Sequence, residues 1–464
     1  MKKILIILSI GFLSFLPRER LDMTLAELPV APLEMPSLRP FPMAKGYGAN
    51  WQLSATAPVI EVTSKSARGA GTLHEALTAT STDRRITFAE GGVYDIGDDF
   101  TANGNVAIEG QTAPGTGVTF TSSSGGIRWE SGNVIIRNVR FRGSGGNNSM
   151  FDFFSNGASD LTNVIIDRCS FSWPTQVGGG EMMIQFGDQF FNSNTIQAHE
   201  ATFQRCIFAQ GTRAVLMFNG SYNATFWQNF YYDPGFRTPM SNYPGNGPDN
   251  VLTFEAINQI ISQTTSAISP GLGSKISVVG NKLDNEGTSL SYSGFIRGEA
   301  FGGCDNSAGS NYNCASSTDG YVYVSDNEVD GEAEVAGGDL ASRVEATPFE
   351  PLSIAAADIL PVSQIDDILP NIGAQPRDQY DTDFVDAYLN NSTAIGTTSQ
   401  TLNTSIYTSG TKPTDADNDN IADAWEDHPL SSLAIDKGSE LIPSSLSRLL
   451  AALISESPTL DSYS

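Results

Sequence analysis

A nine-residue pattern that recurs along the chain limits the possible folds more than any other feature of the sequence. Each copy has apolar residues at positions 2 and 4, a polar or mixed residue at position 5, and a large apolar residue at position 9. The six copies are NVIIRNVRF from Asn133, NVIIDRCSF from Asn163, EATFQRCIF from Glu200, NATFWQNFY from Asn223, KISVVGNKL from Lys275 and YVYVSDNEV from Tyr321. A weaker copy, NVAIEGQTA, starts at Asn105. One such unit of two short strands and a bend cannot bury its apolar side alone, but stacked units can.

The repeat predicts an all-β protein, namely a single-stranded right-handed parallel β-helix followed by an irregular C-terminal extension. In this fold, equivalent residues of successive coils form stacks. One predicted stack holds Val139, Cys169, Cys206, Asn229, Asn281 and Asn327, and another holds Phe141, Phe171, Phe208, Tyr231, Leu283 and Val329. Positions 3 and 5 should face outward and form a flat wall, which long loops border as a cleft. The alternative, a β-sandwich, needs hairpins with two-residue turns, and the sequence has few of these.

Composition narrows the classes of partner. Hydrophobic residues make up 40% of the 464 residues, enough for a sizeable core, and charged residues only 17%, too few for a helical bundle. The net charge of −26 makes nucleic acid and anionic membranes poor partners. Residues 128–237 nevertheless hold eight arginines against eight acidic residues, so an acidic ligand could be tolerated there. Most of these arginines are expected at solvent-facing strand positions.

Four segments are expected along the chain. Residues 1–20 have the shape of a signal peptide, with two lysines before an apolar run too short to span a membrane, and they predict a secreted protein. Residues 40–345 should form the β-helix. Residues 346–430 should form the extension, with a short helix in PRDQYDTDFVDAYL (376–389). Residues 431–464 are a Ser/Leu-rich tail.

Several segments, in this order, carry a resemblance to a known family. They are GYGAN (46–50), VTSKSARGAGTLHEAL (62–77), RRITFAEGGVYDI (84–96), VAIEGQTAPGTGV (106–118), NVIIRNVRFRG (133–143) and NVIIDRCSFSW (163–173). On these motifs the chain resembles the pectate lyase superfamily, polysaccharide lyase family 1, and especially its bacterial secreted members. The resemblance covers roughly residues 40–428. It implies a right-handed β-helix, calcium dependence and β-elimination of polyuronate chains.

The resemblance also assigns residues to this chemistry. β-Elimination needs a base for the C5 proton, a cation that neutralises the neighbouring carboxylate, and a site that holds the developing negative charge. The family's Arg-x-Pro motif falls at residues 237–239, which makes Arg237 the expected base. Arginine is a poor base in water because its pKa is above about 12, so part of this role is electrostatic. A salt bridge from Arg237 to Asp233 is the alternative. Arg213 is the candidate clamp for a substrate carboxylate, and Arg168 is a further candidate for substrate binding.

The resemblance gives an incomplete set of calcium ligands. Asp152 best matches the family's upstream acid, and Glu181 fits the glutamate position after Ser-Trp. Asp167 keeps the family's aspartate, although Arg168 replaces the usual histidine after it. Gln185, on the same outer side by strand parity, is neutral. Because Ca²⁺ prefers several carboxylate oxygens, a site with Asp152 and Glu181 alone should bind calcium weakly or depend on substrate carboxylates.

A second calcium signal lies in DADNDNIADAWE (415–426). Positions 1, 3, 5, 7, 9 and 12 of an EF-hand-like loop are occupied by Asp415, Asp417, Asp419, Ile421, Asp423 and Glu426. Asn420 replaces the usual glycine, and asparagine tolerates left-handed backbone geometry. A solvated acidic turn is the alternative. The complete register favours a structural Ca²⁺ site without a catalytic role.

The sequence leaves two functions open. The first is a secreted, monomeric, calcium-dependent polysaccharide lyase that cleaves a pectate or polygalacturonate-type uronan by β-elimination. The second is a β-helix that binds a glycan without catalysis, or that acts on a different glycan as a phage-like depolymerase. An acidic polysaccharide is the expected partner of the first. Neither nucleic acid nor a membrane span is expected.

Overall fold

Three β-sheets contain most of the regular structure. The computed structural model describes residues 39–54, 56–122, 124–143, 149–154, 160–174, 182–187, 198–217, 221–235, 237–241, 252–264, 268, 274–284, 321–333, 344–392 and 402–410. The helices in these ranges are α2 (Leu73–Thr78), α3 (Gln379–Leu389) and the 3₁₀ segments η1 (Tyr47–Asn50), η2 (Gly110–Thr112), η6 (Ala356–Asp358), η7 (Val362–Asn371) and η8 (Thr404–Ile406). None of the helices in these ranges combines the length and the apolar character that crossing a membrane requires.

Each sheet is built from strands that are far apart in the sequence. Sheet 1 runs in the order β1 (Val59–Val62), β2 (Arg84–Phe88), β5 (Val106–Glu109), β8 (Val134–Arg137), β11 (Leu161–Asp167), β14 (Ala198–Gln204), β17 (Ser221–Trp227), β20 (Thr253–Ile257), β22 (Lys275–Val279), β24 (Tyr321–Ser325) and β27 (Val344–Glu345). Sheet 2 runs β3 (Gly92–Asp95), β6 (Val118–Thr121), β9 (Val139–Arg142), β12 (Ser170–Ser172), β15 (Ile207–Ala209), β18 (Phe230–Tyr232), β21 (Ile260–Ser262), β23 (Lys282–Asp284), β25 (Glu328–Val329) and β26 (Glu332–Ala333). Sheet 3 runs β4 (Phe100–Ala102), β7 (Ile127–Trp129), β10 (Ser149–Phe154), β13 (Met182–Gly187), β16 (Val215–Met217) and β19 (Met240–Ser241).

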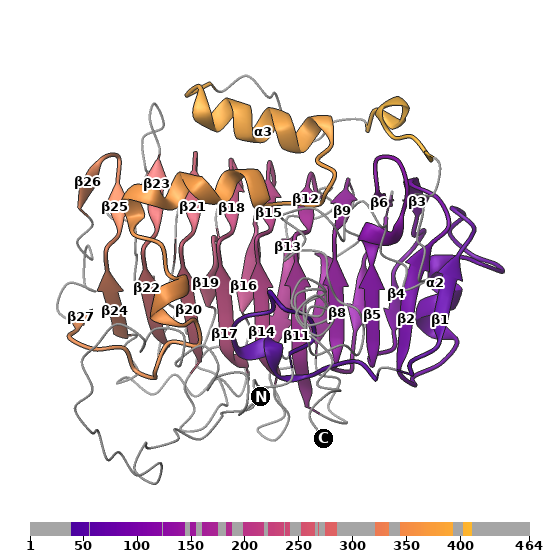
Figure 1. The fold of residues 1–464 in the computed structure, drawn as a ribbon, viewed down its shortest axis with the longest axis horizontal. Coiled ribbons are helices and arrows are strands. Elements are labelled where there is room, and N and C mark those ends of the chain that lie inside the picture. The colour runs from indigo at the N-terminus through magenta and orange to yellow at the C-terminus, as the bar shows by residue number, and fades with distance from the viewer. Residues whose placement is uncertain are drawn as a thin grey trace, which may run out of the picture. The chain divides into compact units, whose positions relative to one another are not determined.

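The chain visits the three sheets in turn, so that each circuit is one coil of a helix. For example, β8 in sheet 1 is followed by β9 in sheet 2, β10 in sheet 3, and then β11 in sheet 1 of the next coil (Figure 1). Among the described strands all neighbours pair in parallel except β25 and β26. The predicted all-β parallel β-helix is therefore confirmed.

From β8 onward, a single residue with left-handed backbone makes the bend from sheet 1 to sheet 2. Examples are Asn138 (φ 51°), Arg168 (φ 49°) and Arg205 (φ 53°). Such a conformation is unfavourable for most side chains, but hydrogen bonds to the next coil hold it. The Asn138 N–H donates to the carbonyl of Asp167 at 3.1 Å, and the Arg168 N–H donates to Gln204 at 3.0 Å. Stacking therefore fixes the bends of neighbouring coils together.

The two predicted stacks are present, with one coil more than the sequence analysis counted. Phe141, Phe171, Phe208 and Tyr231 lie in register. The extra coil contributes Ile261 after Tyr231, because TFEAINQII from Thr253 forms β20 and β21. It accounts for the long interval before Lys275. In the other stack, Cys169 and Cys206 are buried free thiols, as expected.

The asparagine stack forms a hydrogen-bonded ladder inside the protein. Asn229 Nδ2 donates to Gln259 Oε1 at 2.9 Å, so the extra coil places a glutamine in the ladder. The Gln259 N–H then donates to Asn281 Oδ1 at 2.7 Å, and the Asn281 N–H donates to Asn327 Oδ1 at 2.9 Å. Buried amides are tolerated because each one finds partners in the neighbouring coils.

The outward-facing wall that was predicted on sheet 1 is covered by residues 39–53, the segment that precedes the β-helix in the sequence. Phe41, Ala44, Ala49 and Leu53 pack as one apolar cluster on outward-facing residues of sheet 1, namely Ala107, Ile135 and Ile165. Ile135 and Ile165 are at template position 3 and are only 3% and 1% exposed. The expectation of an open cleft on this sheet is therefore wrong, because residues 39–53 occupy it.

Gly48 in the GYGAN motif lets this covering segment lie against the sheet. A Cβ at Gly48 would lie 2.2 Å from the carbonyl oxygen of Val164 and 2.7 Å from the backbone nitrogen of Thr202. The Gly48 N–H also donates to Thr202 Oγ1 at 2.9 Å. Backbone on both sides makes this contact rigid, so a side chain has no room.

Gly48→Ala is expected to lower the free energy of unfolding by about 1–3 kcal/mol, the usual range for overpacking a well-packed site. The segment must lift from sheet 1 to admit the methyl group, and this exposes Ile135 and Ile165 to water. Thermal unfolding and hydrogen exchange of residues 39–54 would measure the effect. Asn50→Ala, at an exposed neighbour, is the control. Equal melting temperatures for the two variants would contradict the prediction.

The C-terminal extension covers the outer face of sheet 2. The predicted helix in 376–389 is confirmed as α3, and its N-cap Asp378 accepts a hydrogen bond from the Asp381 N–H. Apolar residues of η7 and α3, including Ile368 and Phe384, pack on Trp173 of the bend after β12 and on strands β15, β18 and β21. Figure 1 shows α3 lying along the sheet 2 strands.

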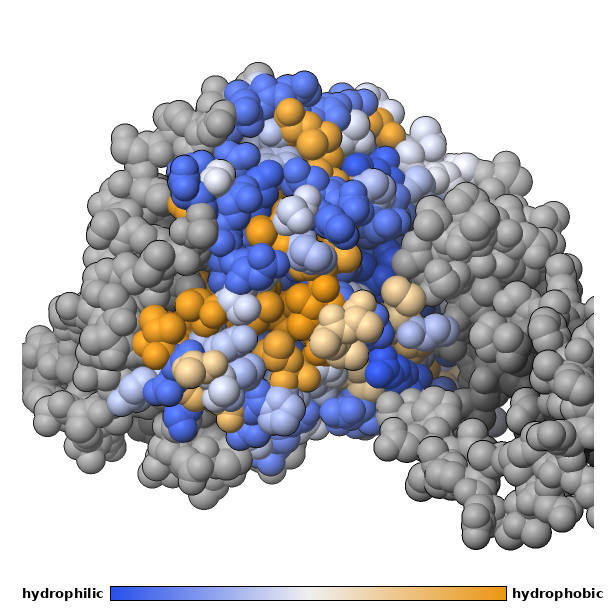
Figure 2. All heavy atoms as spheres, turned by 60° about the vertical axis from the view of Figure 1, so that its left-hand side comes forward, coloured by the Kyte–Doolittle hydropathy of each residue, from blue (hydrophilic) through white to orange (hydrophobic). Residues whose placement is uncertain are grey.

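At the C-terminal end of the stack of coils, strands β24 and β27 are less well covered by described residues. Tyr321 of β24 and Val344 of β27 are each 40% exposed. Figure 2 turns this end toward the viewer and shows a group of apolar residues within a largely hydrophilic surface.

Candidate active site

Sheet 3 presents a row of outward-facing side chains, one from each coil. The register aligns Arg128 of β7 with Asp152 of β10, then with Gln185 of β13 and Leu216 of β16. Their strand neighbours, such as Phe151 and Phe153, face inward and belong to the main core. Polar groups that are at least 24 residues apart in the sequence therefore lie side by side on one face of the sheet.

Asp152 is a buried carboxylate whose pKa is raised. Only 6% of the residue is exposed. Burial raises the pKa of Asp152 to about 7, although the Ser149 hydroxyl and Arg128 favour the charged form. Oδ1 of Asp152 is buried and has no hydrogen-bond partner among the described residues. A carboxylate held in this way would gain most from a cation placed against it.

The neighbour of Asp152 in the next coil is polar but neutral. Gln185 is 5% exposed, and its Nε2 donates to the Ser149 hydroxyl. It offers a carbonyl oxygen but no charge. Glu181, the other candidate ligand, lies outside the described residues, immediately before the first residue of β13. Among the described residues no cluster of three or more His, Cys, Asp or Glu side chains could hold a metal.

Arg213 and Arg237 precede neighbouring strands of the same sheet. The carbonyl of Arg213 accepts from the Met183 N–H at 3.2 Å, and the carbonyl of Arg237 accepts from the Val215 N–H at 2.8 Å. Nη1 of Arg237 lies 2.9 Å from Sδ of Met182. Met182 in turn is in register with Ser149, which binds Asp152. The structure therefore places Arg213 and Arg237 on the same sheet as Asp152.

The backbone of Arg237 differs from the rest of the β-helix. Its φ is 67°. Arg237 belongs to none of the three series of left-handed residues in the β-helix, which lie just before or in the first residues of sheet 1 strands, between sheets 1 and 2, and after sheet 2 strands. Non-glycine residues in this region carry strain of about 1–3 kcal/mol and cluster at functional sites. The isolated outlier at Arg237 therefore supports a functional role.

Asp167 and Arg168 are not brought to this face. Asp167 ends β11 in sheet 1 and is fully buried in an ion cluster. Its carboxylate lies 2.6 Å from Arg205 Nη2, 3.4 Å from Arg168 Nη1 and 3.6 Å from Arg137 Nε. Burial alone would raise the pKa of Asp167, but these three arginines hold it below its usual value. The sequence assigned Asp167 to calcium and Arg168 to substrate, whereas the geometry gives them a structural role.

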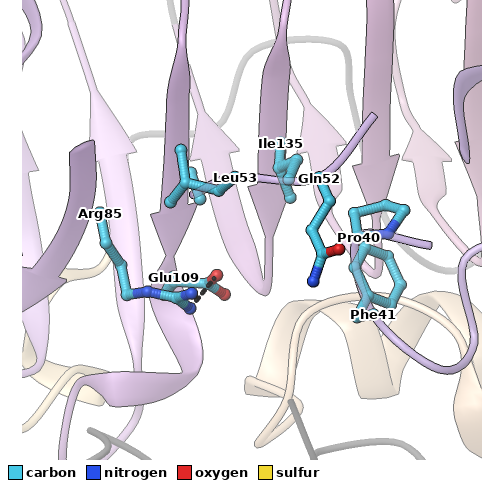
Figure 3. Close-up of a pocket in the computed structure, with 8 residues that line it drawn as sticks. Pro40, Phe41, Gln52, Leu53, Arg85, Glu109 and Ile135 are labelled. Atoms are coloured by element: carbon cyan, nitrogen blue, oxygen red, sulfur yellow. Dashed lines mark hydrogen bonds and ion pairs between the residues drawn. The ribbon is translucent and has the colours of Figure 1, made fainter. Parts of the chain in front are cut away.

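The ion cluster continues toward a small pocket on sheet 1. Glu109 accepts from Arg85 Nη1 at 3.0 Å and lies 3.5 Å from Arg137 Nη1. Figure 3 shows Arg85 and Glu109 paired in this pocket, with Gln52 and Phe41 of the covering segment opposite them. Its charged groups already bind each other, and the pocket lies on a different sheet from Asp152.

Acid is expected to weaken the protein through Asp167. A carboxyl whose pKa is depressed on folding stabilises the protein above its unfolded pKa of about 4, and this stabilisation is lost as the pH falls through the folded-state pKa. Asp167→Asn should remove that pH-dependent part and also destabilise the protein near neutrality, because Arg205 and Arg137 lose their counter-charge. Thermal unfolding across the acid range would compare the two proteins. Parallel curves, offset by a constant amount, would contradict this assignment.

The arginines between residues 128 and 237 were expected to face solvent, and for most of them this is wrong. Five are no more than 3% exposed: Arg137, Arg140, Arg142, Arg168 and Arg205. Arg142 Nη2 lies 3.0 Å from Asp378 and 2.6 Å from Asp381, and both carboxylates belong to the C-terminal extension. The arginines do point outward from the sheets, but other parts of the chain cover them.

The EF-hand-like positions all lie outside the described residues, so they stay a prediction. These are Asp415, Asp417, Asp419, Ile421, Asp423 and Glu426. Arg128 is not identified by any sequence motif, because sheet 3 strands such as IRW (127–129) do not follow the nine-residue template. Only the register with Asp152 identifies Arg128 as part of this face.

Comparisons with known proteins agree with this architecture. No protein-family model matches the chain. A probable pectate lyase C of Aspergillus fumigatus (CEA10) is 31% identical over 220 residues, which are 46% of this chain and 47% of the relative. A probable pectate lyase C of Aspergillus flavus is 28% identical over 406 residues, 83% of this chain and 86% of the relative. The chain thus spans about half the length of the curated relatives that it matches first. These relatives are fungal, although the motifs resembled bacterial members.

Two solved structures share the fold. The cedar pollen allergen jun a 1 superposes with a TM-score of 0.50 at 15% identity, covering 71% of this chain and 92% of that one. A Bacillus subtilis pectate lyase variant gives a TM-score of 0.50 at 13% identity, covering 73% of this chain and 99% of the other. At such low identities the likeness extends to the β-helix alone.

Proposed function

Since the chain is similar to the pectate lyases in sequence and shares their parallel β-helix, we propose that it is a polysaccharide lyase that cleaves a pectate or polygalacturonate-type chain by β-elimination. The observation that supports this proposal is the face of sheet 3, where the buried carboxylate of Asp152 lies in register with Arg128, and where Arg213 and Arg237 immediately precede two further strands of the sheet. In a protein with a net charge of −26, this gathering of cations suits an acidic polymer.

The proposed reaction breaks the C4–O bond of a uronate residue after loss of its C5 proton. The electron pair of the C5–H bond forms the C4–C5 double bond, and the leaving sugar keeps the oxygen with the electron pair of the C4–O bond and takes up a proton from water. In this proposal Arg237 would meet the C5 proton. Since a guanidinium is ordinarily protonated, Arg237 acts as base only where other cations and burial favour proton loss, and it otherwise stabilises the developing charge. Arg213 would hold a substrate carboxylate, for which its planar fork is suited.

Calcium is the proposed cofactor of this face. Asp152 and Glu181 would hold it, with the carbonyl oxygen of Gln185 as a neutral neighbour. The buried and unsatisfied Oδ1 of Asp152 supports this fit. When bound, a divalent cation neutralises the substrate carboxylate and so lowers the charge that elimination must create. With so few carboxylates, the site should bind calcium more tightly when substrate supplies oxygen ligands. Residues 415–426 would hold a second, structural Ca²⁺.

The remaining parts of the proposal concern export and organisation. We propose that residues 1–20 direct secretion, that 40–345 form the lyase β-helix, and that 346–430 form an extension that includes the second calcium loop. Residues 431–464 would be a peripheral tail. The enzyme would act as a monomer, outside the cell, on an acidic polysaccharide.

The decisive test is the ultraviolet absorbance of the unsaturated product while the purified protein acts on polygalacturonate. A rise that needs calcium and stops with a chelator would establish elimination. No rise on polygalacturonate or on other uronate polymers would refute the lyase proposal. Binding of a glycan without turnover would then favour a non-catalytic β-helix, and cleavage without an unsaturated product would favour a depolymerase of another class.

A further inference from the structure

We propose that Arg128 binds a carboxylate of the polymer one coil before Asp152, and that a divalent cation on Asp152 releases Arg128 for this contact. The inference rests on the proposed function and extends it to a residue that the sequence motifs do not assign. Arg128 occupies the centre of β7, in register with Thr101 of β4 on one side and Asp152 of β10 on the other. Its neighbours Ile127 and Trp129 are buried in the core, so Arg128 faces outward.

The side chain of Arg128 is more exposed to solvent than the buried arginines of the other two sheets. Its side chain is 30% exposed, compared with 9% for its partner Asp152. Arg137, Arg140 and Arg142 are no more than 2% exposed, and each lies within ion-pair distance of a buried carboxylate, Asp167 for Arg137 and Asp378 for the other two. Arg128 is therefore a cation of this region that a polymer in solution could reach.

The contacts of Arg128 leave most of its guanidinium available. Nη2 lies 3.8 Å from Asp152 Oδ2, which is longer than a charge-assisted hydrogen bond of about 2.7–2.9 Å. The guanidinium also lies 5.8 Å from the ring centroid of Phe154, a cation–π contact that orients it. No hydrogen bond joins Arg128 to another described residue. A guanidinium that is held in place but lacks a bidentate partner among the described residues is suited to bind a carboxylate from outside.

Position along the β-helix indicates what this carboxylate belongs to. Neighbouring coils lie about 4.8 Å apart, so the row on sheet 3 runs along the helix axis. Arg128 comes one coil before Asp152, whereas Arg213 and Arg237 come after it, next to β16 and β19. A polyuronate carries a carboxylate on every sugar and, lying along this row, would meet cations on both sides of the elimination site. Arg128 would thus lengthen the binding site at the end opposite Arg237.

A cation on Asp152 and the Arg128 ion pair compete for the same carboxylate. A divalent cation bound to Asp152 takes the negative charge that attracts Arg128 and adds a repulsive positive charge nearby. Arg128 then turns to the next available carboxylate, which the substrate supplies. Removal of Arg128 should consequently have opposite effects on two ligands: it should weaken polymer binding and strengthen binding of the cation to Asp152. A purely structural ion pair that is partly exposed is worth about 0–1 kcal/mol and would produce neither effect.

The test is Arg128→Gln in the full-length chain that also carries Arg237→Ala, so that polymer is bound without being cleaved. Titration calorimetry would measure the affinities for Ca²⁺, for polygalacturonate, and for a fully methyl-esterified galacturonan, which has the same sugars without charge. We expect about tenfold weaker binding of polygalacturonate, which corresponds to about 1.4 kcal/mol. We also expect unchanged binding of the ester and several-fold tighter binding of Ca²⁺. Asp152→Asn identifies which part of the calcium signal belongs to this site.

Arg68→Gln is a matched control, because Arg68 is also a surface arginine over an aromatic ring, that of Phe100 at 5.2 Å. It should change none of the three affinities. If Arg128→Gln does not fold, Arg128→Lys keeps the charge but not the fork and should give a smaller loss. Unchanged polymer binding, an equal loss for the ester, or unchanged calcium affinity would each overturn the inference. A wild-type protein without elimination activity would instead refute the proposed function, and the two failures are therefore separable.

Discussion

Arg237→Lys is expected to lower kcat on polygalacturonate by about 10²–10⁴-fold, the usual contribution of a positioned proton-transfer group. Lysine keeps the positive charge but loses the planar fork of the guanidinium, whose Nη1 lies 2.9 Å from Met182 Sδ. Because Arg237 is only partly buried, the melting temperature should change little. Initial rates of unsaturated product formation, with thermal unfolding of the same samples, would measure both.

Two comparisons make the result for Arg237 specific. Arg68→Lys, a surface arginine beside Phe100, should retain wild-type kcat. Arg213→Lys should raise KM more than it lowers kcat, since a clamp acts on bound substrate before and during the reaction alike. If Arg237→Lys kept most of the wild-type kcat, another group would have to remove the proton, and the assignment of Arg237 would be wrong.

The largest expected loss of stability follows from Asp381→Ala. Asp381 is fully buried, lies 2.6 Å from Arg142 Nη2, and accepts a hydrogen bond from the Ser170 hydroxyl at 2.7 Å. Removing one partner of such a buried pair leaves an uncompensated charge and costs about 3–5 kcal/mol. Arg142 would keep Asp378, but both lie beneath α3, so the helix should loosen from sheet 2. Denaturant unfolding and hydrogen exchange of α3 would report this.

Asp386→Ala is the matched control, because Asp386 lies on the exposed side of the same helix. It should change the free energy of unfolding by less than about 0.5 kcal/mol, as surface substitutions usually do. Similar effects of Asp381→Ala and Asp386→Ala would show that the buried ion pair does not hold the extension on the β-helix.

The fold was predictable because a β-helix repeats its core. Phe141, Phe171 and Phe208 appear at one template position and stack in one column, so the sequence contains the register directly. The coil from Thr253 follows the same template at Phe254 and Ala256 but was missed. The repeat thus predicts the overall architecture well, but it does not identify every individual coil.

The surroundings of the charged residues could not be predicted in the same way. An outward position in a strand says nothing about what covers it. The partners of Arg142 are 236 and 239 residues away in the sequence, in a segment without the repeat. Arg128 was missed for a related reason, because its importance lies in its register with Asp152 and not in any local motif. Asp152 was found only through the family resemblance.

The way the β-helix is covered has a consequence for how the chain reaches its native state. Lys45 of the covering segment 39–53 and Asp358 of the C-terminal extension are 313 positions apart in the sequence and form a 2.7 Å ion pair. Apolar residues on the outer face of sheet 1, such as Ile165 and Ile257, therefore stay exposed to water until two segments dock on them. One segment precedes the β-helix in the sequence, and the other follows it. Contacts of such long range slow folding and prolong exposure of strand edges. For this chain, the slow step should be the docking of the two covering segments, with the coils already stacked.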